Sequence, residues 1–450
     1  MNIAKMRYNI PYPVDFIIRR IMDNGGKAYI VGGAVRDMIL GKPVNDWDIA
    51  TSFKPEQVES LFSDMHTIPT GKKFGTVTII VNNMPVEVTT FRGEDQYTDY
   101  RHPDNITFVP DIKLDLSRRD FTINAIAYNP YQEPAIIDPM DGLSDIKNKL
   151  IRTVGVASCR FAEDPLRMMR GARFLSQLGF DMESSTRNAI ADNASLILKV
   201  SSERIKDELD KLLMGHFPYK GLSLMFDVGL FDLIFSLSTC QRIDVNCTAQ
   251  LKMLNSYPRD IILRLAAVFN FAVIPSDINN HEFIVQMIKK VLCRLRYDKQ
   301  TIKHISNIVP NVRTTKFSQQ NAKLAYQLKK LVSQIGETDA FRVIFIKEKT
   351  DLGKNTSTNI SDILQQILNR KEPIYISDLA ITGYDLVKLG IGKDNPKVIG
   401  DLLKLAQEWV LQCPRRNDAK YLLPRLQSIM PSGKDSESHK NYHYNKNNAY

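Results

Sequence analysis

The hydrophobic pattern of the chain changes near residue 160, and this change constrains the fold more than any other feature of the sequence. Before it, short runs of β-branched and aromatic residues are separated by turn signals such as Asn82-Asn83 and Asn129-Pro130. The runs lie at residues 28–31, 76–81, 86–91 and 123–128, and a helical pattern lies at 55–65. The first 150 residues are therefore predicted to form a mixed α/β domain.

From about Ala162 onward the apolar residues follow the period of a helix. Leu166, Met169, Phe174 and Leu178 recur at steps of three to five residues, and Gly179 stands where a C-terminal cap is expected. Further helices are predicted at residues 202–213, 261–271, 283–296, 320–335 and 396–411. The C-terminal two-thirds of the chain should therefore be all-α and divided into several lobes.

Two weaker boundaries are predicted within the helical part, near residues 215–218 and 350–358. The last twenty residues, 431–450, carry almost no aliphatic side chains and are predicted to be disordered. A length of 450 residues is typical of two to four domains.

The charge balance and the cysteines narrow the class of protein. Sixty Lys and Arg against fifty Asp and Glu give a net charge of +10, which favours a polyanionic partner. Nucleic acid is the first expectation and an acidic membrane surface the second, while a basic protein with no such partner is equally compatible. Five cysteines, widely spaced and without a CxxC pair, disfavour zinc fingers and a disulfide framework. With no apolar run of signal-peptide or membrane-span length, a cytoplasmic location is expected.

A glycine turn followed by an acidic pair is the first chemical signal. The apolar run that ends at Val31 leads into Gly32-Gly33, and a helix near Val35 would turn its positive end toward a bound triphosphate. Arg36 could add a cationic fork for the same phosphates. A strand–turn–helix without a ligand is the plainer interpretation of this segment taken alone.

Asp46 and Asp48 follow this turn closely. On a strand, residues two apart project to the same side, so the two carboxylates would converge on Mg²⁺, which prefers oxygen ligands. A pair of such ions activates an attacking oxygen and stabilises a leaving one in phosphoryl transfer. Glu87, in an alternating run, is predicted to be a third acidic group, with an exposed strand residue as an equal alternative.

Five ordered motifs between about residues 25 and 215 resemble those of the class II tRNA nucleotidyltransferases, the family of CCA-adding enzymes and bacterial poly(A) polymerases. They are Gly32–Asp37 with Asp46-Trp47-Asp48, Asp115–Ala125, Asp138–Gly142 with Ile151–Val154, Glu163–Arg167, and Ser202–Ile205 with Glu208-Leu209. The resemblance implies an α+β protein, in which a small mixed sheet of the nucleotidyltransferase type is followed by an all-α neck, body and tail. The implied ranges are 1–150 for the catalytic head, 151–217 for the neck, 218–355 for the body and 356–430 for the tRNA-binding tail.

The resemblance also implies how a nucleotide is bound and selected without a nucleic-acid template. Asp164 and Arg167 would read the Watson–Crick edge of the base, and Arg170 and Arg173 continue the same helix face toward base or triphosphate. Arg119, Asp120 and Asn124 match family positions that contact the nucleotide. An arginine suits phosphate, and an Asp or Asn suits ribose hydroxyls. Arg118 is left open as a surface charge.

The reaction implied is attack of the tRNA 3′-OH on the α-phosphate of CTP or ATP, with Mg²⁺ held by Asp46 and Asp48 and pyrophosphate released. Residues 93–104 resemble the flexible loop of complete CCA-adding enzymes, which argues against a CC-only enzyme. A poly(A) polymerase or an A-adding enzyme remains the closest alternative, and a non-catalytic RNA-binding protein a more distant one. No His-Asp dipeptide of an appended phosphohydrolase occurs.

Basic stretches in the helical part are candidates for contacts with the tRNA backbone. A solvated helix face is at least as good an interpretation of each stretch taken alone. The stretches are Lys289-Lys290 with Arg294, Arg296, Lys299 and Lys303; Lys329-Lys330; and Arg415-Arg416 with Lys420 and Arg425.

Overall fold

The computed structural model describes residues 9–69, 71–93, 107–235, 245–274, 279–350, 359–391 and 396–429. The chain divides into two compact units, the first ending at Pro310 and the second beginning at Asn311. The predicted segments 94–104, 351–358 and 431–450 lie outside the described residues. None of the described helices combines the length and apolar character that a membrane span needs.

A seven-stranded mixed sheet forms the centre of the N-terminal part, in the order β3-β4-β5-β2-β1-β6-β7. The strands are β1 (Ala28–Val31), β2 (Asp48–Thr51), β3 (His66–Ile68), β4 (Thr76–Val81), β5 (Met84–Thr90), β6 (Ala127–Tyr128) and β7 (Ile136–Ile137). β2 and β5 run parallel, whereas the other neighbouring pairs of this sheet are antiparallel. The predicted small mixed sheet is therefore confirmed.

The β4–β5 hairpin turns at Asn82 and Asn83, which both have positive φ values of 49° and 62°. Two such residues between antiparallel strands are typical of a tight hairpin, and Asn tolerates this conformation better than most residues. The turn fixes the register in which Val81 faces Met84 and Thr78 faces Glu87. The sequence signal at this turn was therefore correct.

Helices pack against the sheet and complete its core. Val14, Ile17, Ile18 and Ile21 of α1 are fully buried, as the apolar period of this helix requires. A cluster that includes Tyr29, Phe91 and Leu116 fills the space between the sheet and α4. The helices of this part are α1 (Tyr12–Asp23), α2 (Gly33–Ile39), α3 (Pro55–Leu61), α4 (Ile112–Ser117) and α5 (Gly142–Asn148).

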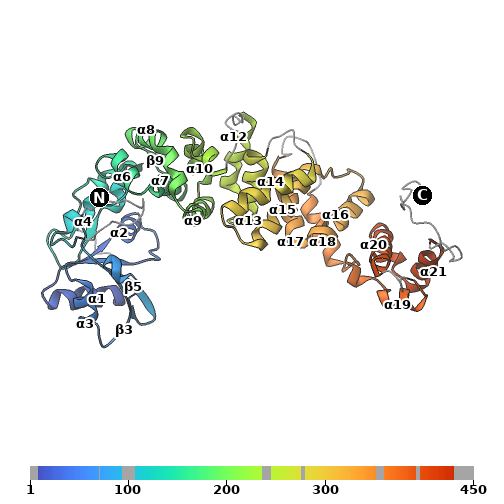
Figure 1. Ribbon diagram of the computed structural model, residues 1–450, viewed down its shortest axis with the longest axis horizontal. Helices are drawn as coiled ribbons and strands as arrows, with labels where there is room; N and C mark the ends of the chain where they lie inside the picture. Colours follow the sequence, from blue (N-terminus) through green and yellow to red (C-terminus); the bar gives the residue numbers. More distant parts are fainter. Residues whose placement is uncertain are drawn as a thin grey trace. The chain divides into compact units, whose positions relative to one another are not determined.

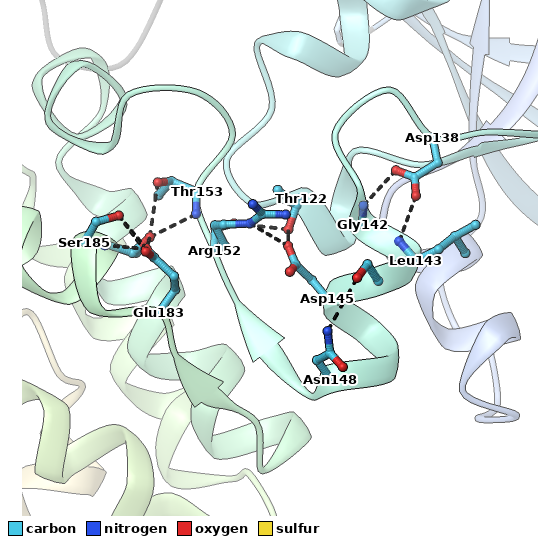
Figure 2. A network of polar contacts seen from close by, with 12 residues as sticks. Thr122, Asp138, Gly142, Leu143, Asp145, Asn148, Arg152, Thr153, Glu183 and Ser185 are labelled. Atoms are coloured by element: carbon cyan, nitrogen blue, oxygen red, sulfur yellow. Dashed lines mark hydrogen bonds and ion pairs between the residues drawn. The ribbon is translucent and has the colours of Figure 1, made fainter.

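A polar network holds the segment that follows Asp120 (Figure 2). Arg152 Nε lies 2.9 Å from Asp145 Oδ2, and the hydroxyl of Thr122 donates to the same oxygen at 2.5 Å. Asp138 accepts hydrogen bonds from the first backbone amides of α5, those of Gly142 and Leu143, at 2.8 Å each. Residues 122–124 form a short 3-10 helix here, so the predicted strand 123–128 is reduced to β6.

In the described residues of the rest of the first unit, helices predominate (Figure 1), and the strands are those of a two-stranded sheet, β8 (Leu150–Ile151) and β9 (Asp181–Met182). Gly179 ends α7 with φ of 72°, which confirms the predicted cap. The helix predicted at 261–271 ends at Val268 and continues as a short π-helix, Phe269–Val273. These helices are α6 (Ala157–Glu163), α7 (Leu166–Leu178), α8 (Ser184–Asn193), α9 (Ser202–Leu213), α10 (Pro218–Asp227), α11 (Leu230–Phe235), α12 (Val245–Lys252), α13 (Ile261–Val268), α14 (His281–Arg294) and α15 (Lys299–Thr314).

The second unit has only helices among its described residues, as predicted. Its core includes Leu386, Ala406, Leu422 and Leu426, which are all fully buried. The helices are α16 (Asn321–Ile335), α17 (Glu337–Thr350), α18 (Ile360–Asn369), α19 (Gly383–Lys388), α20 (Pro396–Gln412) and α21 (Ala419–Ile429), after the last residues of α15.

Candidate active site

A cavity of about 540 Å³ opens between the sheet, the β1–α2 turn and the helices α7 and α9. This volume is in the range of small-molecule sites. Its lining includes the following predicted site residues: Gly32, Gly33, Asp48, Glu87, Arg119, Asp120, Asn124, Asp164, Arg167 and Arg170. Asp46, Arg36 and Arg173 lie outside this lining.

The glycine turn places bare backbone against two charged side chains. Gly32 has φ of 70° and ψ of −134°, a conformation that side chains disfavour strongly. A Cβ atom at this position would lie 2.9 Å from Arg119 Nη1 and 4.0 Å from Asp48 Oδ2. Only glycine therefore permits both this turn and the approach of Arg119.

Arg36 lies behind the cavity wall. Its guanidinium donates to Asn124 Oδ1 at 2.7 Å and to the two oxygens of Asp37 at 2.9 Å each. The group also lies over the ring of Phe174, 5.2 Å from its centre. Arg36 therefore holds Asn124, a residue of the lining, and is itself buried.

The parallel pairing of β2 and β5 brings two carboxylates together. Asp48 and Glu87 are register partners on these neighbouring strands, and both line the cavity. Burial and the charge of Glu87 raise the pKa of Asp48, the charge of Arg119 lowers it, and Asp46 raises it further. β2 begins at Asp48, so Asp46 is an exposed residue just before the strand.

These carboxylates suit a divalent cation by their chemistry. Burial and the neighbouring Glu87 raise the pKa of Asp48, so a nearby positive charge would favour its ionised form, and divalent ions such as Mg²⁺ prefer hard oxygen donors of this kind. The described residues contain no group of three or more His, Cys, Asp or Glu side chains arranged to hold a metal ion. The candidate oxygen donors are therefore Asp48 and Glu87 in the cavity lining, together with Asp46, whose charge also raises the pKa of Asp48.

Asp120 and Arg170 form an ion pair at the cavity wall. Arg170 Nη2 and Nε lie 2.6 Å and 2.7 Å from Asp120 Oδ2, and Asn124 donates to Oδ1 at 3.2 Å. Burial alone raises the pKa of Asp120, but the charge and hydrogen bonds of Arg170 outweigh it and leave the pKa well below its usual range. Asp120 is therefore ionised at neutral pH in this arrangement.

The predicted base-reading residues line the cavity, but their side chains do not pair with each other. Asp164 Oδ1 accepts from the Leu166 amide at 3.1 Å, and Arg204 of α9 donates to the carboxylate at 2.8 Å and 3.3 Å. Arg167 instead donates to Glu163 at 2.5 Å and to the backbone oxygen of Arg118 at 3.3 Å. Each of the two is thus fixed by a separate partner.

Arg204 lines the cavity although it was not among the predicted site residues. The sequence signal was present, since Arg204 belongs to the segment that resembles the family's fifth motif. Arg173 Nε lies 2.6 Å from Oε2 of Glu208, which follows Arg204 by four positions on α9. The guanidinium of Arg173 also lies over the ring of Phe174. Arg118, left open as a surface charge, also lines the cavity.

Several of the predicted tRNA-contacting cations are already engaged within the protein. Lys329 is 4% exposed and lies 3.0 Å from Glu372, and Lys330 lies 2.9 Å from Glu408. Arg294 donates to the backbone oxygen of Ile234. The stretch at Lys329-Lys330 therefore fits a structural role better than contact with a nucleic acid.

Comparisons with known proteins show which family the chain resembles. The family model for the Poly A polymerase head domain matches residues 28–152, and one described as the probable RNA and SrmB-binding site of polymerase A matches 179–238. The CCA-adding enzyme of Anoxybacillus flavithermus is 34% identical over 415 residues, which cover 90% of this chain and 94% of that enzyme.

The CCA-adding enzyme of Lactiplantibacillus plantarum is 52% identical over 215 residues. This match covers 48% of this chain and 52% of that enzyme, so the chain spans about half of that enzyme's length. A crystal structure of the Bacillus stearothermophilus CCA-adding enzyme in complex with CTP superposes with a TM-score of 0.74 and 28% identity. The superposition covers 93% of this chain and 99% of that one.

Proposed function

The chain belongs to the CCA-adding enzyme family, and we propose that it adds C, C and A to the 3′ end of tRNA from CTP and ATP, with release of pyrophosphate. The observation that carries this proposal is the single cavity that joins the Asp48–Glu87 pair, the Gly32 turn and the side chains of Asp164 and Arg167. A carboxylate pair, a glycine turn with accessible backbone and a donor–acceptor set for a base are the three parts that the reaction needs.

In this proposal Asp48, Glu87 and Asp46 would hold Mg²⁺ as a pair of ions. When bound, magnesium supplies Lewis-acid activation of the 3′-OH and neutralises charge on the phosphates. Arg119 lies between the carboxylates and the glycine turn, where its charge favours the triphosphate. Asn124 and Asp120 are assigned to the ribose hydroxyls, with Arg36 and Arg170 holding them in place.

Selection of the base is assigned to Asp164 as acceptor and Arg167 as donor. Arg204 fixes the orientation of the Asp164 carboxylate, and Glu163 does the same for Arg167. Side chains held in this way present a constant pattern of hydrogen-bonding groups, as a template base would. The catalytic head, neck, body and tail at 1–150, 151–217, 218–355 and 356–430, and a cytoplasmic location, are part of the same proposal.

Poly(A) polymerase activity is the second candidate, because the matching head-domain model carries that description. The relative that aligns over 94% of its own length is a CCA-adding enzyme, which favours the first candidate. Incubation of a tRNA lacking its CCA end with CTP and ATP, followed by sequencing of the products, separates the two. Addition of C, C and A and then a stop supports CCA addition, whereas long A tracts on unrelated RNA would support the polymerase.

The metal-site assignment has its own test. Asp48→Ala and Asp46→Ala are expected to abolish nucleotide incorporation while tRNA binding persists, because the carboxylates act on the reaction and not on the RNA backbone. Asp227→Ala removes a half-exposed aspartate that forms an ion pair with Arg187 outside the cavity lining, and this variant should retain activity. Normal turnover by either Asp46→Ala or Asp48→Ala would refute the assignment.

A further inference from the structure

Asp115 is a buried carboxylate that contacts the cavity wall from behind. It lies on α4, its side chain is 1% exposed, and it does not line the cavity. Arg118 and Arg119 follow it by three and four residues, which places all three side chains near one face of the helix end.

Both oxygens of the Asp115 carboxylate accept hydrogen bonds from residues of the cavity wall. Oδ1 accepts from Arg118 Nη2 at 2.5 Å and Nε at 3.1 Å, and from the Arg92 amide at 3.2 Å. Oδ2 accepts from Arg119 Nη2 at 3.0 Å and Nε at 3.3 Å. Arg92, Arg118 and Arg119 all line the cavity. One hidden group therefore fixes three residues of the wall.

The charge of Asp115 is stable in this position. Burial raises the pKa of its carboxyl, but the charges of Arg119 and Arg118 and their hydrogen bonds outweigh it and lower the pKa to about 2. At neutral pH the carboxylate therefore stays ionised and holds the Nε–Nη2 edges of both guanidinium groups.

The remaining edge of Arg119 is directed to the site. Its Nη1 atom is the group that a Cβ on Gly32 would approach to 2.9 Å, and its charge lowers the pKa of Asp48. Among the described residues this nitrogen has no hydrogen-bond partner. Arg118 likewise uses Nε and Nη2 for Asp115. Within the described part of the chain, Nη1 is therefore the nitrogen of each arginine that is left for an anion.

We propose that Asp115 is a positioning residue for the triphosphate, which turns the Nη1 atoms of Arg118 and Arg119 toward the nucleotide's phosphates. The inference rests on the proposed function, because it takes a nucleoside triphosphate as the ligand of this cavity. It predicts that Asp115 affects the phosphates of CTP and ATP equally and leaves recognition of the base unchanged.

The test is Asp115→Asn, which keeps the shape and removes the charge. The KM values of CTP and ATP should rise together by about tenfold, as when one charge-assisted contact is lost. The inhibition constant of inorganic triphosphate, which has no base, should rise by the same factor, and the KM of tRNA should change less than twofold. A rise for the nucleotides without a rise for inorganic triphosphate would overturn the proposal.

Asp145→Asn is the matched control. Asp145 is also buried and holds an arginine, Arg152, but that arginine does not line the cavity (Figure 2). This variant should lose comparable stability and leave the inhibition constant of inorganic triphosphate within about twofold. An equal increase in both variants would show that Asp115 contributes only to stability, and would refute the positioning role.

A triple variant, compared with the double arginine variant, tests whether Asp115 acts through the two arginines. In a chain that carries Arg118→Gln and Arg119→Gln, adding Asp115→Asn should change the inhibition constant less than twofold further. A full tenfold further loss would contradict the proposal. If Asp115→Asn does not fold, Asp115→Glu displaces the charge by one methylene and should give the same nucleotide-specific weakening. An unchanged KM in Asp115→Glu would then count against it.

The proposed function and this inference can fail separately. A wild-type protein that adds no nucleotide to tRNA but is displaced from a fluorescent nucleotide by inorganic triphosphate would refute CCA addition. In that protein the displacement by inorganic triphosphate still measures the effect of Asp115→Asn. An active wild type with an unaffected Asp115→Asn variant would refute only the positioning role.

Discussion

Gly32→Ala tests whether the close approach of Arg119 to the glycine turn matters for nucleotide binding. The substitution has two separate effects. The backbone at Gly32, with φ of 70° and ψ of −134°, is strained for alanine, which costs about 1–3 kcal/mol of stability. The new methyl group also meets Arg119 Nη1 at 2.9 Å, so the guanidinium must move to an ordinary contact distance of 3.4 Å or more.

The second effect determines the functional result. A shift of about half an ångström, from 2.9 Å to 3.4 Å, weakens a charge-assisted hydrogen bond from Arg119 to a phosphate. Such bonds contribute about 1.5–3 kcal/mol. Losing the lower part of this range raises the KM of CTP and ATP by about tenfold.

Gly25→Ala separates strain from displacement. Gly25 also has a positive φ, of 83°, but a Cβ there would meet nothing within 4 Å. This variant should lose about 1 kcal/mol in urea denaturation and keep the KM of the wild type. Steady-state incorporation of CTP and ATP measures both variants. If Gly32→Ala has the KM of Gly25→Ala, then Arg119 does not depend on the glycine turn and the assignment of the triphosphate to this place is wrong.

Three further predictions concern the ion pairs of the site. Arg170→Gln leaves Asp120 buried without its partner and should lower the free energy of unfolding by about 3 kcal/mol. Adding Asp120→Asn should recover part of this loss, and equal urea midpoints for wild type and Arg170→Gln would contradict the prediction. The pKa of Asp115 is lowered from 3.8 to about 2, so its stabilisation of about 2 kcal/mol is present above pH 3.8 and is lost as the pH falls through 2. Urea denaturation at pH 5 and pH 2.5 should show a loss of about 1.5 kcal/mol from this group, and Asp115→Asn should show a smaller loss. Arg204→Gln removes the ion pair that holds the Asp164 carboxylate and should increase incorporation of UTP and GTP at least about tenfold. The inhibition constant of inorganic triphosphate should stay unchanged. An unchanged preference for CTP and ATP would show that Arg204 has no part in base selection.

The sequence predicted elements well where a local signal sets their ends. The apolar period of 202–213 and the glycine at 179 gave the bounds of α9 and the end of α7 as the structure has them. The strand predicted at 123–128 was too long because Thr122 bonds to Asp145, more than twenty residues away, and the chain turns into a 3-10 helix there. Such a contact leaves no local trace in the hydrophobic pattern.

In the candidate site, too, local signals predicted the residues but not the contacts between them. The types of its residues were predicted from spacing and resemblance, and the cavity collects most of them. Their pairing was not predictable, since Arg167 lies three residues from Asp164 yet bonds to Glu163, while Asp164 is held by Arg204, forty residues along the chain. Packing of α9 beside α7 decides between these partners, and it depends on the tertiary structure.

The two-residue turn at Asn82 and Asn83 has a consequence for how this sheet tolerates insertions. The hairpin fixes the register of β5, and in this register Glu87 lies opposite Asp48 of β2. Side chains alternate between the two faces of the sheet along a strand. One residue inserted between Met84 and Glu87 would carry Glu87 to the opposite face, where it would point into apolar surroundings. Two inserted residues would restore the face but shift the carboxylate along β2 by about 7 Å, out of reach of Asp48. The sheet should therefore tolerate inserted residues best in the turn, before Met84, where they do not change the face or the register of Glu87.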